Sequence, residues 1–412
     1  MRRTFIFILL LLLFFRITVF SQNQHLDYYI SAGLHNSALL KDYGNRIRSN
    51  AFDSLKIVAG QRPQASVFAQ ALYAPVSANF GYDSAITNGG NYAALISVNQ
   101  PLFRNHFRNS QFENIALLNQ SLAANATITE NDLKKSITAQ YITAYSDYTL
   151  VEFSRSILQL LNGEETLLRT LVEKGIYLQS DYLNLSVSIR ALEISITQDM
   201  LQYKNDIYAL NILCGIFDTS TVTLSKPELQ AQTNIDIQNS PLMLQFKIDS
   251  LKNINSKTLV DLNYKPKLNA FADAGFNSIN PKNVPHNFGT SVGVNFSMPI
   301  YDGRQRKIEY GKISLAEVTR AAYKDFYQTQ FQSQVQQLKE RLAGTNELII
   351  KINNQLTEQQ KLIDLYKLEI EKGLVRFTDF ITATNNYFNT RYSLKQSEIN
   401  RQQIINELNY IK

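Results

Sequence analysis

The stretch EKGIYLQSDY at Glu173–Tyr182 is matched 198 residues later by EKGLVRFTDF at Glu371–Phe380. In both, a glycine is followed by four residues, then a hydroxyl-bearing residue and an aspartate. The glycine suits the left-handed position just past a helix end. The hydroxyl suits the N-cap of the next helix, and the aspartate suits its first turn. The sequence therefore predicts two matched helical hairpins, each with its tip at one of these stretches.

Other segments repeat in the same order. Phe68–Ala71 returns 203 residues later as Phe271–Ala274, and Pro101 returns 198 residues later as Pro299. The offset falls by five residues between these matches, so the first copy is expected to have a longer loop there. This period far exceeds the roughly 20–50 residues of a solenoid unit. The chain is therefore predicted to be one module duplicated in tandem.

The chain divides into a predicted secretory signal at residues 1–21, a first repeat at 22–215 and a second repeat at 216–412. Arg2 and Arg3 precede an apolar run, as in export signals. A membrane anchor is the alternative, although the run is shorter than the about 20 residues that span a bilayer. The signal holds three arginines and no acid, so removing it lowers the net charge from +6 to +3. That charge does not predict a nucleic-acid partner.

Two windows without proline, between Pro101 and Pro227 and after Pro299, are rich in good helix formers. Apolar residues recur in them at spacings of three and four, as at Ile352 and Leu356. The predicted helices are residues 103–173 and 180–214 in the first repeat, and 241–262, 303–372 and 378–411 in the second. The longest would extend about 100 Å at ~1.5 Å per residue, which favours antiparallel coiled coils.

Ahead of each long helical window the pattern changes to period two. Phe288, Val292 and Phe296 alternate with small or polar residues such as Gly289 and Ser291, which is typical of a strand. The predicted strands are residues 63–74, 91–100, 266–277 and 287–299. Their lengths are near the about 9–11 residues of a transmembrane strand. A soluble hairpin packed on the helices would give the same alternation.

Four strands cannot close a barrel, and an open sheet edge cannot exist in lipid. If these strands span a membrane, several chains must therefore combine them. Three chains would give twelve strands, enough for an aqueous lumen lined by the small and polar strand face. Tyr73, Tyr82, Tyr92 and Tyr301 could then form aromatic girdles at the membrane interfaces, with ordinary packing as the alternative.

No residue pattern predicts catalysis, a cofactor or a firm metal site. The one cysteine, Cys214, cannot form a disulfide within the chain, and the four histidines do not cluster in the sequence. The sequence has no Gly-x-Ser-x-Gly, His-Glu-x-x-His or phosphate-loop motif. We therefore expect a protein that is not an enzyme.

With the tandem repeat, the two tips and the strand ending at Asn295–Gly303, the chain resembles the TolC-type outer-membrane efflux proteins. The resemblance covers nearly the whole chain after the signal. It implies a mainly α fold with a small β part, in which the long antiparallel helices form a periplasmic α-barrel. The four strands would contribute to a trimeric twelve-stranded transmembrane β-barrel. Short helices near residues 25–58 and 216–262 would form an equatorial belt.

The resemblance implies a function as well as a fold. It implies a homotrimer, placed in the lipid of an outer membrane, that acts as a passive export channel. The expected partners are a periplasmic adaptor, of the membrane fusion type, and an inner-membrane pump or secretion ATPase. The alternative is a periplasmic coiled-coil adaptor or scaffold without a pore. The cargo is not predicted, because specificity in such systems lies mostly with the pump.

The resemblance also assigns a role to the charged helix tips. In this family, aspartates at the periplasmic mouth form a cation-binding constriction, and Asp379 matches that aspartate by its place after Gly373. Under three-fold symmetry, Asp379 and Asp181 would each form a ring that attracts cations. The alternative is that both only interact with the positive end of a helix dipole. The gate and tip residues predicted on this basis are Ser180, Asp181, Arg376, Thr378 and Asp379, with Ser180 and Thr378 as N-caps.

The chain departs from the family pattern at the gate. The family's second acid is replaced by Thr382, its gate tyrosine is replaced by Ile370, and Arg376 lies one place from the family's arginine. The bonding of a closed gate is therefore not predicted. The residues expected to act only as structural turns are Gly175, Gly373, Pro101, Pro299 and Gly303.

Overall fold

The computed structural model describes residues 25–77, 80–83, 89–218, 220, 222–232, 235–370 and 372–411. The predicted signal at residues 1–21 lies outside this part of the chain. The described residues form two compact units, and each unit takes part of both sequence repeats. The first unit holds the described residues of 1–40, 128–237 and 328–412, and the second holds those of 41–127 and 238–327.

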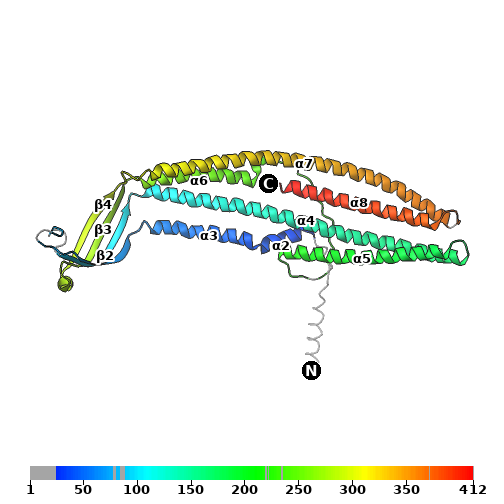
Figure 1. Cartoon of the computed structure of the whole chain (residues 1–412), viewed down its shortest axis with the longest axis horizontal. Helices are drawn as coiled ribbons and strands as arrows, with labels where there is room; N and C mark the ends of the chain where they lie inside the picture. The colour runs from blue at the N-terminus through cyan, green and yellow to red at the C-terminus, as the bar shows by residue number, and fades with distance from the viewer. Residues whose placement is uncertain are drawn as a thin grey trace, which may run out of the picture. The chain divides into compact units, whose positions relative to one another are not determined.

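The helices and strands follow the predicted order (Figure 1). The first repeat contains α2 (Leu26–Asn36), α3 (Ala38–Ala59), β1 (Gln64–Tyr73), β2 (Gly90–Leu102), α4 (Asn105–Glu173) and α5 (Gln179–Cys214). The second contains η1 (Ile237–Asn239), α6 (Pro241–Asn263), β3 (Lys267–Ser278), η2 (Pro281–His286), β4 (Phe288–Ser297), α7 (Gln305–Ile370) and α8 (Phe377–Asn409). The predicted class, with long helices and four strands in one sheet, is confirmed.

The short helix predicted at residues 241–262 is present as α6, whereas the earlier part of the range 216–262 implied by the resemblance differs from the expectation. The α-helix α6 begins at Pro241, and the described residues of 216–236 contain no helix. Pro227 has no amide hydrogen, and Ser220 and Ser225 can bond to nearby backbone, which favours irregular structure. The prediction was therefore wrong for the first half of that range.

The second unit contains an antiparallel sheet in the order β1-β2-β3-β4. Strands β1 and β4 are its edges: among the described strands, β1 pairs only with β2 and β4 only with β3. The register places all large apolar members of the β4 alternation on one side, which we call the apolar face. Most of its residues are apolar: Ala65, Val67, Ala69, Ala71, Tyr73, Tyr92, Ala94, Ile96, Val98, Leu102, Leu268, Ala270, Ala272, Ala274, Phe276, Phe288, Val292, Val294 and Phe296, with Gly90, Gln100, Ser278 and Thr290 as the exceptions.

The opposite side of the sheet, which we call the polar face, is rich in Ser, Asn, Gln and Gly. Its residues include Ser66, Gln70, Ser97, Asn99, Asn269, Asp273, Asn277, Ser291, Gly293 and Asn295, together with Phe68, Leu95 and Phe271. In the described part of the chain, Val67 and Val292 on the apolar face are 80% and 84% exposed. The sheet therefore presents two chemically different faces and two open edges.

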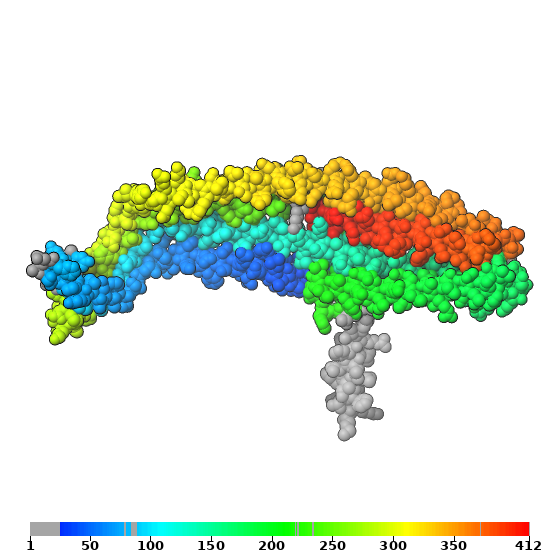
Figure 2. All heavy atoms as spheres, in the orientation of Figure 1, coloured from blue at the N-terminus to red at the C-terminus, as the bar shows by residue number. Residues whose placement is uncertain are grey.

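The first unit is built from α5, α8 and parts of α4 and α7, with α2 packed against one end of α5. Its apolar core includes Tyr29, Tyr141 and Tyr203, and the Tyr141 hydroxyl donates to the carbonyl of Ser225 at 2.7 Å. Figure 2 shows α5 and α8 along the visible face of this unit, with α4 between them. None of the described helices has an apolar stretch suited to crossing a bilayer.

Candidate functional site

The two helix tips predicted from the repeat lie side by side at one end of the first unit (Figure 1). Gly175 and Gly373 are both left-handed, with φ of 74° and 69°. After each glycine the next amide donates five residues back, from Ile176 to Leu171 and from Leu374 to Glu369, both at 3.0 Å. These are the bonds of a Schellman motif, which satisfies the last carbonyls of a helix. The first helix of each hairpin therefore ends in the same backbone motif.

The start of the returning helix differs from the prediction. Ser180 and Thr378 lie in the first turn of α5 and α8, whereas the N-cap residues are Leu178 and Arg376. The physical reason is visible at Asp181, whose carboxylate accepts the Leu178 amide at 3.2 Å. An acid at the third helical position can satisfy the cap amide without a hydroxyl at the cap. The N-cap assignment of Ser180 and Thr378 was therefore wrong.

Asp379 occupies the matching position at the second tip, but it bonds differently. Its carboxylate pairs with the Arg376 guanidinium, with Nε–Oδ2 and Nη2–Oδ1 distances of 3.2 and 3.4 Å. The Arg376 side chain is 82% exposed, so this pair contributes at most about 0.5 kcal/mol to stability. Within the described chain no lysine or arginine pairs with Asp181. Asp379 therefore has a cationic partner in its own chain, whereas Asp181 has none among the described residues.

A tyrosine joins the two tips. The Tyr177 hydroxyl donates to the Val375 carbonyl at 2.8 Å and also lies 3.4 Å from the Ile370 carbonyl. Its ring meets Phe377 edge to face, with centroids 6.1 Å apart. Burial, together with the nearby charge of Asp181, raises the pKa of Tyr177. Sequence reasoning missed this residue, and the available signal was the difference between Tyr177 and its repeat partner Val375.

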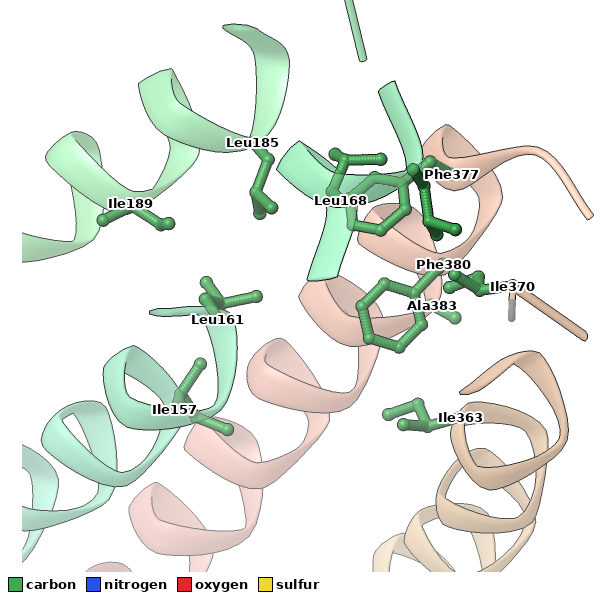
Figure 3. Close-up of a cluster of buried hydrophobic side chains, with 11 residues drawn as sticks. Ile157, Leu161, Leu168, Leu185, Ile189, Ile363, Ile370, Phe377, Phe380 and Ala383 are labelled. Atoms are coloured by element: carbon green, nitrogen blue, oxygen red, sulfur yellow. The ribbon is translucent and has the colours of Figure 1, made fainter. Parts of the chain in front are cut away.

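An apolar cluster lies between the helices next to both tips (Figure 3). It is formed by α4, α5, α7 and α8, and its buried members are Ile157, Leu161, Leu168, Leu171, Leu185, Ile189, Ile363, Ile370, Phe377, Phe380 and Ala383. Ile370 and Phe380 are fully buried. Burial of apolar area is worth about 25 cal/mol per Å², so this cluster stabilises the packing of the four helices next to the tips.

Among the described residues, the side chains of Ile370 and Thr382, which depart from the family pattern, take no part in polar contacts between the tips. Ile370 belongs to the apolar cluster through its side chain, and only its carbonyl faces Tyr177. The Thr382 hydroxyl donates to the Thr378 carbonyl of its own helix at 2.8 Å. Among the described residues, the side-chain hydrogen bond that links the two tips comes from Tyr177.

A half-buried acidic pair lies further along the same helices. Burial, then a hydrogen bond to Asp206 and the charges of Asp206 and Asp199, raises the pKa of Asp147 to about 8. Despite burial, hydrogen bonds from Asp147, Gln202 and Gln140 lower the pKa of Asp206. Asp147 on α4 therefore holds the proton of the pair at neutral pH, and Asp206 on α5 is ionised. No group of three or more His, Cys, Asp or Glu in the described part of the chain is placed to hold a metal ion.

The remaining predicted turn residues lie in the second unit. Pro101 is near the end of β2, opposite Asn269, and Pro299 follows the end of β4. Gly303 is left-handed, with φ of 63°, and lies two residues before the start of α7. The prolines thus mark the ends of the strands, where a missing amide donor removes the fewest sheet hydrogen bonds.

No protein-family model matches the chain, and no curated protein matches it. Solved structures do match over 93% of its length. The outer-membrane channel OprN matches with a TM-score of 0.73 at 14% identity over 89% of its chain. The outer membrane protein VceC of Vibrio cholerae matches with a TM-score of 0.70 at 13% identity over 95% of its chain. The outer membrane channel CmeC of Campylobacter jejuni matches with a TM-score of 0.71 at 11% identity over 85% of its chain.

These likenesses extend over both sequence repeats and over both compact units, so they concern the whole architecture and not a single hairpin. The fold of this chain is that of the TolC-type outer-membrane channel proteins.

Proposed function

We propose that three copies of this chain form a passive export channel through an outer membrane. The observation that carries the proposal is the four-stranded sheet with two open edges. Three successive antiparallel pairings leave β1 and β4 running in opposite directions. Strand β4 of one copy can therefore pair antiparallel with β1 of the next, and three copies give twelve strands with no edge left open.

The apolar face supports contact of this sheet with lipid. Aromatic residues gather at both of its ends, with Tyr73, Tyr92 and Phe288 at one end and Phe296 at the other. From Phe288 to Phe296 is eight residue steps, or about 27 Å along the strand at ~3.4 Å per residue. At the tilt of about 35–45° found in outer-membrane barrels, this length covers about 19–22 Å of height, close to the about 25 Å apolar band that aromatic girdles border.

The long helices carry a second surface that supports assembly. Apolar residues recur along the exposed side of α5, and they include Leu183, Val187, Ile194, Leu201 and Ile212. Exposed apolar stripes of this extent mark interaction surfaces in most proteins. We propose that α5 packs against helices of a neighbouring copy, so that the helices continue the channel wall below the sheet.

The tips are proposed as the periplasmic mouth of the channel. Three copies of Asp181 and of Asp379 would surround the opening, and their carboxylates would attract cations. The exposed turn residues Leu178 and Leu374 offer apolar contact points for a periplasmic adaptor, with an inner-membrane pump or secretion ATPase beyond it. The structural neighbour CusC is described by its transmembrane channel formation, which supports the same role here. We propose no catalytic activity for the chain.

The test is reconstitution of the exported protein in planar bilayers and sizing of the detergent-extracted form. The proposal expects outer-membrane localisation, trimers that resist dissociation by detergent, and discrete single-channel conductance. A folded product found only in the soluble periplasmic fraction would contradict it. That result would favour a coiled-coil adaptor or scaffold without a pore.

A further inference from the structure

One carboxylate stands in the middle of the polar face of the sheet. Strands β1 to β4 are described throughout, and their only charged side chains are Lys267 and Asp273, both on β3 and both on the polar face. Asp273 pairs with Ser97 on β2 and with Ser291 on β4 in the strand register. It lies near the midpoint of β3, whereas Lys267 is the first residue of that strand.

The surroundings of Asp273 form a continuous polar row across the sheet. The register places Ser66, Ser97, Asp273 and Ser291 side by side, one from each strand. The Ser97 hydroxyl donates to Asp273 Oδ1 at 2.5 Å, and the Ser291 hydroxyl donates to Oδ2 at 3.3 Å. Both carboxylate oxygens therefore accept hydrogen bonds from hydroxyls, and no lysine or arginine of the described chain forms an ion pair with them.

Bulky apolar side chains border this row on the same face. Phe271 lies two residues before Asp273 and covers Gly293, where an added Cβ would be 2.5 Å from the Phe271 ring. Phe68 and Leu95 face each other one row further on. Asp273 and Ser291 themselves line an open hollow of about 410 Å³. The carboxylate is thus partly exposed to solvent in a mostly polar hollow, with apolar side chains on the neighbouring rows of the same face.

We propose that Asp273 makes the barrel lumen selective for cations over anions. The inference rests on the proposed trimeric channel, in which the polar face lines water and three copies of Asp273 form a ring. Lys267 cannot neutralise that ring, because six residue steps place it about 20 Å away along β3 at ~3.4 Å per residue. This distance exceeds the Debye length of about 10 Å at 0.1 M salt. Rings of acidic side chains select cations in other pores.

The test measures the reversal potential of single channels in a KCl gradient at about 0.1 M salt, for the wild type and for Asp273→Asn. We expect a cation-selective wild type and a permeability ratio about three- to tenfold closer to unity in the variant. Asp273→Glu keeps the charge and should keep the selectivity. Lys267→Gln is the matched control, because it removes the distant charge and should leave the ratio nearly unchanged.

A second variant protects the test against failure of assembly. Ser66→Lys adds a positive charge to the same row while leaving Asp273 intact, and it should lower cation selectivity in the same direction. Conducting channels whose selectivity is unchanged in both Asp273→Asn and Ser66→Lys would overturn this proposal alone. A wild-type protein that forms no channel would overturn the proposed function and this inference with it.

Discussion

A charged residue on the apolar face of β4 should block assembly, whereas the same residue one position further along should not. Val294 is 60% exposed on the apolar face, and its neighbour Asn295 is exposed on the polar face. Successive residues of a strand point to opposite sides of the sheet. The variants Val294→Arg and Asn295→Arg therefore carry the same charge on the same strand and differ in the face that receives it.

The expected magnitude follows from the position of Val294. It lies about one to two residue steps from the middle of β4, or roughly 5 Å along the strand at ~3.4 Å per residue. An arginine facing lipid near the bilayer midplane costs about 2–4 kcal/mol. Three copies would add about 6–12 kcal/mol to a trimer, which is comparable to the whole stability of a typical domain. An arginine facing water in the lumen avoids that cost.

The assay is the amount of detergent-resistant trimer in the outer-membrane fraction after equal expression. We expect Val294→Arg to be nearly absent from that fraction and Asn295→Arg to be present at close to the wild-type level. Normal membrane trimers of Val294→Arg, with loss of Asn295→Arg, would show that the two faces are assigned in reverse. Normal trimers of both would refute insertion of this sheet into lipid.

Three further perturbations concern the helical unit. Tyr177→Phe removes the hydrogen bond between the tips, worth about 0.5–1.5 kcal/mol, and should raise single-channel conductance, while unchanged conductance would separate this contact from gating. Asp379→Ala should weaken the block of single channels by multivalent cations in bilayers. Asp181→Ala should weaken this block more, because Asp181 lacks an arginine partner. Equal block of the wild type and both variants would place the cation site elsewhere. In the folded state the pKa of Asp147 is raised from its usual value near 4 to about 8. The stability contributed by the protonated form is therefore fully present below about pH 4 and is lost as the pH rises through about 8. Asp147→Asn should therefore raise the melting temperature at pH 8 by the equivalent of about 1–2 kcal/mol after solvent screening, with little change at pH 4, and a pH-independent effect would contradict the burial of this carboxyl.

Periodicity accounts for much of what could be predicted. The alternation from Phe288 to Phe296 fixes which residues share a face, because a shift of one residue would reverse every side chain. The repeated glycines Gly175 and Gly373 predict the turns, because a left-handed residue after a helix is most often glycine. Both features depend on the backbone conformation of a few neighbouring residues, so the local sequence is enough to predict them.

Other features depended on choices that the local sequence leaves open. A helix start can be satisfied by a hydroxyl at the N-cap or by an acid three residues later, and Ser180–Asp181 offers both. The structure uses Asp181, so the predicted N-cap was wrong. The contact of Tyr177 with the Val375 carbonyl joins residues 198 positions apart, and no spacing rule predicts it. Asp273 is visible in the sequence only after the strand register shows that it shares a row with Ser97.

We propose that one chain supplies a third of a closed wall, because its own sheet ends in two unpaired edges. The most direct measurement is the mass of the protein extracted from membranes in mild detergent, determined by light scattering with the detergent contribution subtracted. We expect the measured protein mass to be three times the mass of the chain without its predicted signal. A monomer with intact strand and helix content would contradict it.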